Sequence, residues 1–229
     1  MTTPKQDMNA MGVLRGLESS GSSVRLRAAL TIGTTPDPEL VDTLIERCAV
    51  EPEFSVREML TWALLRHPPA LTVAKLTDEL RSERAQARSQ ALHTLSKIGD
   101  RRAWPAITWA LLTDADGEVA RSAWRAAVVL VPPGGEPALA TVLSTQFGRG
   151  GREMQLSLSR ALIALGEVVM PVVRAAMEDL DPRVRAHAVA TQRLAQDPDA
   201  GFEFAIEAAK RVVALGPTDE KGMTPGVDR

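Results

Sequence analysis

A short pattern recurs about every 32 residues along most of this 229-residue chain. Each copy has a small apolar anchor, then arginine or another polar residue, then an alanine-rich amphipathic stretch. Successive anchors are 32, 31, 32, 35 and 30 residues apart, and they are Val24, Val56, Ala87, Val119, Met154 and Val184. This period is typical of helical repeats, in which each hairpin buries its apolar face only by stacking on its neighbours. We therefore expect a helical solenoid.

The composition favours an all-α fold. Apolar residues make up 45% of the chain, but aromatic residues only 3%, which suits alanine and leucine packing between helices better than a β-sandwich. Groups of proline and glycine separate the predicted helices. We predict first helices near 8–18, 37–50, 69–82, 101–113, 136–147 and 167–180. Second helices are predicted near 23–33, 54–66, 84–98, 117–131, 152–165 and 182–195, and a closing C-terminal helix near 199–215.

These helices form one predicted solenoid domain over 8–215, between disordered termini at 1–7 and 216–229. In the second helices, the positions four and eight residues after the anchor share its face and are expected in the core. The first set is Ala28, Leu60, Ala91, Ala123, Leu158 and Ala188. The second set is Ile32, Leu64, Leu95, Ala127 and Leu162, with Gln192 departing from the pattern in the last copy.

Several segments resemble the turn and second-helix start of HEAT repeats. They are Ser23-Val24-Arg25, Ser55-Val56-Arg57, the run from Ala87 to Asp100, and Asp181-Pro182-Arg183-Val184-Arg185-Ala186-His187-Ala188. The resemblance covers most of the chain. It implies a right-handed α-α superhelix of about six HEAT-like hairpins plus the closing helix, with the second helices lining the concave face.

The resemblance also implies that the arginine after each anchor pairs with a turn aspartate and ties neighbouring repeats together. That arginine is present as Arg25, Arg57, Arg88 and Arg185, but Ala120 and Gln155 replace it in the fourth and fifth copies. The long 35-residue interval lies in the same region, between the glycine-containing segments 132–135 and 148–151. We expect a local change of curvature there, and local opening to begin there.

The charges are divided between the two kinds of helix. The predicted second helices contain 14 Lys and Arg against 3 Asp and Glu, although the net charge of the chain is only −2. Part of this excess is the structural arginine of each repeat, but the remainder predicts a basic inner groove that attracts acidic partners. Positions three, six and ten after the anchor are expected to face this groove. The candidate partner-binding residues are Arg27, Met59, Trp62, Arg66, Gln90, His93, Lys97, Arg125, Arg160 and His187.

Several side chains have a simple structural interpretation beside a functional one. Trp62, one turn from Met59, could anchor a partner or pack against the next repeat. Trp104, Trp109 and Trp124 are expected as core or inter-repeat filler, and Cys48 as a small buried hydrophobe. His93 and His187 are expected as surface polar residues, because they lie in different repeats and no His-Glu or His-x-x-x-His pair accompanies them. We predict no catalytic residue, metal site or cofactor.

The segment from Gly148 to Arg152 lacks the Gly-Lys-Ser/Thr of a phosphate-binding loop and is expected to be a flexible turn. One cysteine, the lack of a signal-peptide pattern, and apolar runs shorter than about 18 residues predict a cytoplasmic protein without membrane insertion.

The sequence is compatible with three functions. The first is a non-enzymatic scaffold or adaptor that holds an acidic protein or peptide in the groove. The second is nucleic-acid binding by a relative of the HEAT-like DNA glycosylases, without catalysis, because the groove positions hold one tryptophan and no aspartate. The third is a small-ligand role, as in bilin lyases with HEAT-like repeats, which no residue here supports specifically. The oligomeric state is left open.

Overall fold

The computed structural model describes residues 4–197, Ile206 and Lys210, and every regular element in this part of the chain is a helix. The all-α prediction is confirmed. The α-helices are α1 (Pro4–Leu17), α2 (Ser22–Thr34), α3 (Val41–Cys48), α4 (Phe54–Leu65), α5 (Pro69–Glu79), α6 (Ala85–Ile98), α7 (Trp109–Leu112), α8 (Gly117–Leu130), α9 (Glu136–Ser144), α10 (Arg152–Ala164), α11 (Met170–Met177) and α12 (Pro182–Gln196). Three 3₁₀ segments are η1 (Pro38–Leu40), η2 (Arg101–Ala106) and η3 (Glu167–Val169). The predicted tail at 216–229 lies outside the described residues, as does the closing helix near 199–215 apart from Ile206 and Lys210.

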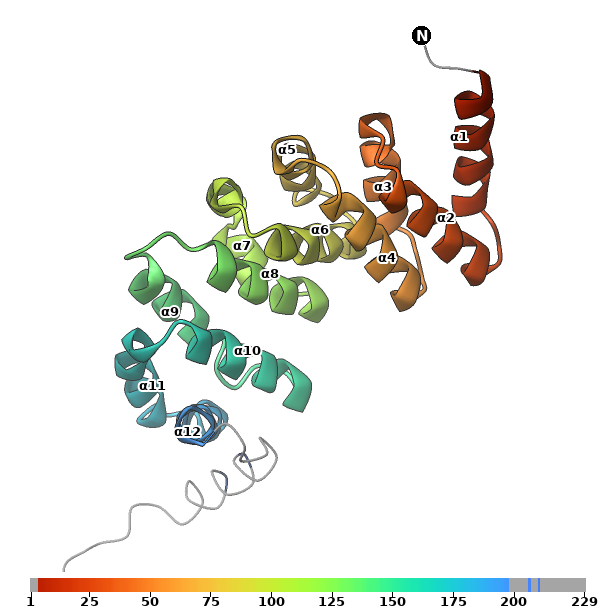
Figure 1. Cartoon of the computed structure of the whole chain (residues 1–229). Coiled ribbons are helices and arrows are strands. Elements are labelled where there is room, and N and C mark those ends of the chain that lie inside the picture. Colours follow the sequence, from red (N-terminus) through yellow and green to blue (C-terminus); the bar gives the residue numbers. More distant parts are fainter. Residues whose placement is uncertain (1–3, 198–205, 207–209, 211–229) are drawn as a thin grey trace, which may run out of the picture. The chain divides into compact units, whose positions relative to one another are not determined.

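The chain divides into two compact units, residues 1–143 and 144–229. In the first unit, α2, α4, α6 and α8 pack side by side in a row, and α3 and α5 cover one side of it (Figure 1). In the second unit, α10 and α11 each pack against α12. The division falls inside the segment 132–152, where the repeat spacing changes. The right-handed superhelix spanning both units stays a prediction.

The second helices begin and end close to the predicted residues, whereas the first helices are more broken. The predicted helix over 101–113 is instead η2 followed by the short α7. Pro105 lacks a backbone N–H and interrupts regular helical hydrogen bonding, and Ile107 is extended between the two segments. Trp109, at the start of α7, is 56% exposed, so its prediction as core filler is wrong.

The predicted core positions of the second helices are confirmed. All residues four and eight positions after the anchor are buried, except the divergent Gln192. The anchors Val56, Ala87 and Val119 are also buried, but Val24 is 46% exposed. Val24 belongs to α2, the first of the second helices, whose main neighbours are α1 and α4. An end copy lacks the cover that a preceding second helix gives to the others.

Two further predictions of burial hold. Trp124 is fully buried, and its Nε1 donates to the Leu112 carbonyl at 2.8 Å. Cys48 is buried as well, and burial raises the pKa of its thiol to about 12. At this pKa the thiol stays protonated near neutral pH, as expected of a small core residue rather than a nucleophile.

An arginine in the first turn of four second helices makes the same pair of backbone contacts. Its Nη1 donates to the carbonyl groups six and five residues earlier, in the turn that precedes the helix. The pairs of carbonyls are Ser19 and Ser20 for Arg25, Glu51 and Pro52 for Arg57, Ser82 and Glu83 for Arg88, and Asp179 and Leu180 for Arg185. These turn arginines therefore fix the connection between the two helices of a hairpin in the same way each time.

Two turn arginines also bind an acid in the following turn, as the HEAT resemblance implies. Arg25 Nε lies 2.8 Å from Glu51 Oε2, and Arg88 Nε lies 3.2 Å from Asp114 Oδ2. Burial alone would raise the pKa of Glu51, but hydrogen bonds from Arg25, the Glu53 backbone and Arg47 lower it to about 2. The side chain of Gln155, which replaces the arginine in the fifth copy, donates to the Gly150 carbonyl at 3.2 Å and pairs with no acid among the described residues.

Candidate interaction surface

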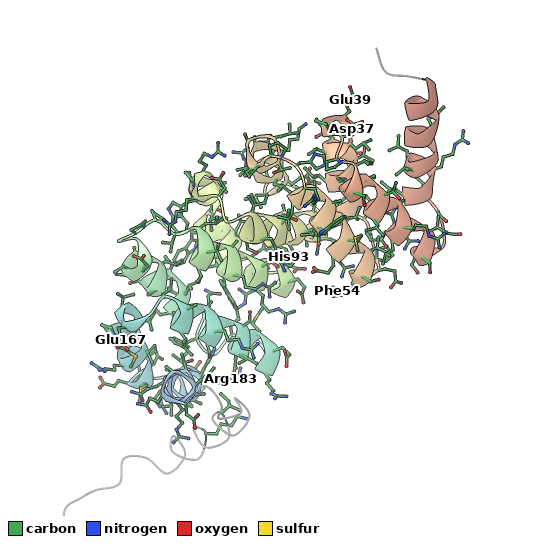
Figure 2. All side chains as sticks on the ribbon, in the orientation of Figure 1. Asp37, Glu39, Phe54, His93, Glu167 and Arg183 are labelled. Atoms are coloured by element: carbon green, nitrogen blue, oxygen red, sulfur yellow. The ribbon has the colours of Figure 1, made fainter. Side chains whose placement is uncertain are left out.

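The predicted groove residues of the first unit gather on the exposed side of its second helices. We call this surface the second-helix face; it comprises Arg27, Leu30, Trp62, Arg66, His93, Lys97, Arg125 and Val129. Figure 2 shows His93 on this row of helices, and Asp37 and Glu39 at the layer that contains α3. Burial lowers the pKa of His93, the charges of Lys97 and Arg125 lower it further, and Glu58 opposes them. Charged groups of α4, α6 and α8 therefore act on one another across this face.

The cations of the second-helix face lack acidic partners. Arg27, Arg66, Lys97 and Arg125 are exposed and form no ion pair with any residue that the structure describes. Arg125 Nη2 bonds only the neutral Ser122 Oγ, at 3.0 Å. Their positive charge thus remains available to a partner.

By contrast, two cations of the first-helix layer are paired with acids. Lys75 of α5 lies 2.6 Å from Asp42 of α3, and Arg102 of η2 lies 2.5 Å from Asp100. Pairing with acids therefore removes positive charge from this layer at Lys75 and Arg102, whereas Arg15, Arg101 and Arg174 form no ion pair with any described residue.

Trp62 combines packing between helices with partial exposure. A Cβ added to Gly33 of α2 would lie 2.2 Å from Trp62 Cζ3, so the indole ring rests directly on the α2 backbone. The ring is still 36% exposed, and the Arg66 guanidinium lies 5.9 Å from its centroid. Leu30 and Val129 add further exposed apolar surface at 42% and 45%. Met59, one turn before Trp62, is half-buried.

His93 has an acidic neighbour that the sequence did not reveal. Its Nε2 lies 2.9 Å from Glu58 Oε1 of α4, although the two residues are 35 positions apart in the chain. The expectation that no His-Glu pair accompanies His93 is therefore wrong, because the packing of α4 against α6 brings these two residues together. Among the described residues no group of three or more His, Cys, Asp or Glu could hold a metal ion.

Two more candidates lie away from this face. The Gln90 side chain lines a separate hollow of about 220 Å³ beside the turn residue Arg57. Arg160 is exposed on α10, in the second unit.

The prediction of His187 as a surface polar residue is wrong, because its side chain is fully buried. Its Nδ1 accepts a hydrogen bond from the Gly148 backbone N–H at 3.1 Å, and its Nε2 lies 2.9 Å from the Gln155 carbonyl. A Cβ on Gly148 would lie 3.1 Å from the Val184 backbone nitrogen, so only glycine lets this loop approach the start of α12 so closely. Burial lowers the pKa of His187 to about 4. The segment expected to be a flexible turn thus covers the histidine.

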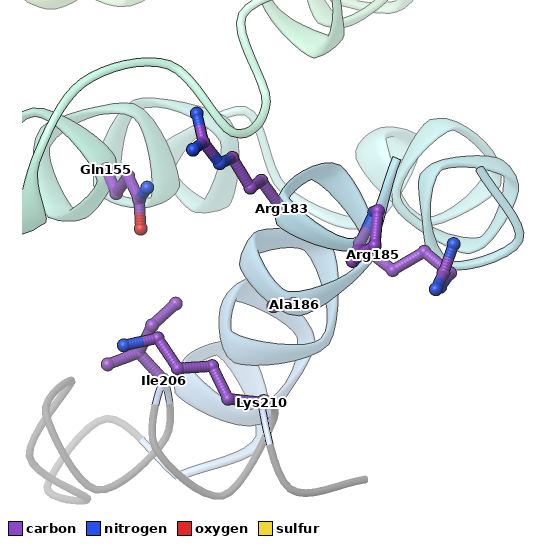
Figure 3. A pocket seen from close by; sticks show the side chains of 7 residues that line it. Gln155, Arg183, Arg185, Ala186, Ile206 and Lys210 are labelled. Atoms are coloured by element: carbon purple, nitrogen blue, oxygen red, sulfur yellow. The ribbon is translucent and has the colours of Figure 1, made fainter. Parts of the chain in front are cut away.

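The second unit has a hollow of its own, of about 350 Å³, at the start of α12. Figure 3 shows Gln155 of α10, Ile206 and Lys210 on one side of α12, Arg183 at the start of this helix, and the Arg185 side chain extending to its other side. The Nη1 of Arg185 is already held by the carbonyls of its own turn. The residues that line this hollow include the apolar Pro182, Ala186 and Ile206 and the cationic Arg183, Arg185 and Lys210.

No known protein-family model matches the chain, and no curated protein is similar to it in sequence. No single helix among the described residues is long and apolar enough to cross a membrane. One pair, Arg152–Ala164 with Glu167–Met177, reaches that length and composition together but is bent by 117°.

Proposed function

We propose that this chain is a non-enzymatic scaffold or adaptor of the HEAT-like α-solenoid type, which binds an acidic protein or peptide segment on the second-helix face. The turn arginines support the repeat assignment, since they repeat the same contacts at the period of the sequence pattern. The single buried cysteine agrees with a cytoplasmic location, which is part of the proposal.

The observation that carries the proposal is the set of unpaired cations beside exposed apolar side chains. Arg27, Arg66 and Lys97 supply positive charge, and Trp62 and Leu30 supply apolar contact area. Protein interfaces are typically centred on tryptophan, tyrosine and arginine with a polar rim. Complementary charge accelerates association and selects partners. An acidic segment with an apolar side chain fits this surface.

The test is an affinity pull-down from native extract with two charge-reversal variants. The face variant changes Arg27, Arg66 and Lys97 to Glu. The control variant changes Arg15, Arg101 and Arg174 to Glu; these arginines are also exposed but lie outside the second-helix face. Arg125 is left unchanged because it bonds Ser122. Circular dichroism confirms that both variants remain folded.

We expect a discrete protein that wild type and the control variant retain and the face variant loses. Its recovery falls as salt is raised, because exposed charges are screened. Recovery that nuclease treatment abolishes overturns the proposal in favour of nucleic-acid binding. Equal recovery by all three proteins shows that the second-helix face is not the binding surface.

A further inference from the structure

The hollow at the start of α12 is a concave site within the second unit. Its volume of about 350 Å³ is in the range of small-molecule pockets. Ile206, which lines it, packs with Ala186, Val189 and Ala190 in a buried apolar cluster. Ile206 and Ala186 are only 9% and 6% exposed, so these two parts of the wall belong to a packed core. The shape of the hollow is thus fixed by the same contacts that attach Ile206 to α12.

Apolar side chains of Pro182, Ala186 and Ile206 form much of the wall. In Figure 3 the Arg183 side chain extends from the start of α12 toward α10, where Gln155 lies. A long cationic side chain covers such a space with its methylene groups while its charged end stays at the edge. An apolar ligand that exchanges contact with water for contact with this wall gains free energy.

Positive charge lies at the edge of the hollow. Arg183 and Lys210 are exposed, and Arg183 forms no ion pair with any residue that the structure describes. Arg185 contributes less charge here, because its Nη1 is held by the carbonyls of its own turn and its side chain extends to the other side of α12. Arg183 is therefore the cation best placed to pair with a ligand beside Gln155.

No carboxylate competes for Arg183 on the described part of the wall, since none of the described lining residues is Asp or Glu. Asp181, which precedes Pro182 in the chain, caps α12: its Oδ1 accepts from the backbone N–H of Arg183 at 2.8 Å. Its carboxylate is thus engaged with the helix start. A ligand with one negative charge complements this edge of the hollow.

The size and the wall restrict the ligand further. A water molecule takes up about 30 Å³ in the liquid, so a hollow of about 350 Å³ holds roughly ten non-hydrogen atoms. A phosphate ion has no apolar part and would leave the surface of Pro182, Ala186 and Ile206 uncovered. A neutral aliphatic molecule would cover this surface but gain nothing from Arg183. A short aliphatic chain with one acidic end satisfies both parts of the site.

We propose that this hollow binds an aliphatic monocarboxylate of medium chain length, with the carboxylate paired to Arg183 beside Gln155 and the chain lying against Ala186 and Ile206. Arginine forms short, charge-assisted hydrogen bonds with carboxylates, often through two parallel donors. The site lies in the second unit. It does not rest on the adaptor function, which is proposed for the second-helix face of the first unit.

The test titrates the full chain with octanoate, which has ten non-hydrogen atoms, and follows the methyl signals of Ala186 and Ile206 by NMR. We expect both signals to shift saturably, with a dissociation constant on the order of 0.1–1 mM. The two methyl groups locate the ligand, because they lie on the wall itself. The proposal fails if neither signal shifts.

Two further ligands separate the contributions of charge and chain. Octanamide has the size of octanoate without its charge, and butanoate has the charge with half the chain. We expect each to bind at least about tenfold more weakly than octanoate, since a buried methylene group contributes roughly threefold to fourfold in affinity. Equal binding of octanamide or of butanoate overturns the proposal, because the site would then recognise only one part of the ligand.

A pair of substitutions tests the assigned place of the carboxylate. Arg183→Gln is expected to weaken octanoate binding about tenfold and to leave octanamide binding unchanged. Arg174→Gln is the matched control, because Arg174 is also an exposed arginine of the second unit but does not line the hollow. It is expected to bind octanoate as wild type does. Octanoate affinity that is the same in Arg183→Gln and wild type overturns the proposed site.

Discussion

His187 joins three segments of the second unit through one buried ring. Since its Nδ1 accepts from the Gly148 N–H, the proton of the neutral imidazole resides on Nε2, which donates to the Gln155 carbonyl. Ser159 Oγ lies 3.1 Å from the same nitrogen, and the Phe147 ring meets the imidazole edge-on at 5.0 Å. The network is complete only while the ring is neutral, because a second ring proton would oppose the Gly148 N–H.

This arrangement predicts that acid destabilises the second unit well before its carboxylates are protonated. The pKa of His187 is about 4 in the folded chain, below the ordinary value of 6.5, so the unfolded chain binds the additional proton. Its contribution to stability is full above pH 6.5 and is lost as the pH falls toward 4. We expect a loss of about 2 kcal/mol in unfolding free energy between pH 7 and pH 5 from this residue, measured by urea denaturation.

The control is His187→Gln, which keeps a polar side chain but does not titrate. His67 and His93 also have lowered pKa values, caused first by burial, and contribute to the total pH dependence. The difference between wild type and His187→Gln isolates the share of His187. An identical pH dependence in the two proteins contradicts the prediction.

Glu51 has the corresponding role in the first unit, where it is a buried polar side chain that joins separate segments as His187 does in the second unit. Its carboxylate accepts from Arg25, Arg47 and the Glu53 N–H, and is fully buried. Buried charges are tolerated only when paired and hydrogen-bonded, and this one holds two consecutive turns together. The same residue type is absent at Ser82, the equivalent place in the next turn, and the Nε of the turn arginine Arg57 has no hydrogen-bond partner among the described residues.

At the scale of elements, the second helices approach one another closely because small residues stand where they meet. Gly33 of α2 is such a residue: its Cα faces the Trp62 ring, and a Cβ would also lie 3.0 Å from the Ala63 Cα. The approach allows Trp62 to cover α2 while its outer part contributes to the second-helix face. The exposed tryptophan of the proposed interface is therefore also a structural contact.

We predict that Gly33→Ala lowers the unfolding free energy by about 1–3 kcal/mol, because the methyl group displaces the Trp62 ring and overpacks the contact. Urea denaturation followed by circular dichroism measures the change. Gly12→Ala is the matched control: Gly12 lies in α1 with nothing near its Cβ position, and alanine there gains about 1 kcal/mol of helix propensity.

A double-mutant cycle identifies the partner of the new methyl group. In a Trp62→Ala background, Gly33→Ala is expected to cost much less, since the ring that it displaces is gone. An equal cost in both backgrounds would show that strain against Ala63, rather than Trp62, determines the effect.

At the scale of the whole molecule, the chain consists of two compact units that meet in sequence at Leu143 and Ser144. Gly134, Gly148 and Gly150 on either side of this point have positive φ angles, which mark tight loop turns. The fourth and fifth copies also lack the turn arginine. Fewer repeated contacts thus stabilise this region than stabilise the first three copies.

We expect limited proteolysis to cut within 132–152 before it cuts elsewhere in 8–215. Local opening in repeat proteins begins where the coupling between neighbours is weakest. Brief digestion with trypsin, followed by mass spectrometry, should give early fragments that end at Arg149 or Arg152. A digest of the urea-unfolded chain shows which other sites are cleavable, and early cleavage at those sites in the folded protein would refute the expectation.

Much of this fold could be predicted from the sequence because its determinants are local and periodic. The anchor spacing, the alanine and leucine stripes, and the proline and glycine breaks predicted the second helices and their buried positions. Those features depend on helix geometry, which is the same in every copy. Cys48 and Trp124 were placed correctly for the same reason, since both fall on apolar stretches of predicted helices.

Tertiary structure determined the burial and pairing of individual side chains at positions where the copies differ. The exposure of Val24, the burial of His187 under the Gly148 loop, and the His93–Glu58 pair depend on which neighbours a helix has, and periodicity does not encode the neighbours of one copy. The missing acid partner of Arg57 Nε is recognised only by comparing its contacts in the structure with the acid pairs of Arg25 and Arg88. The sequence by itself thus determined the helices and their core faces, while packing between copies decided which polar side chains are buried, paired or available to a partner.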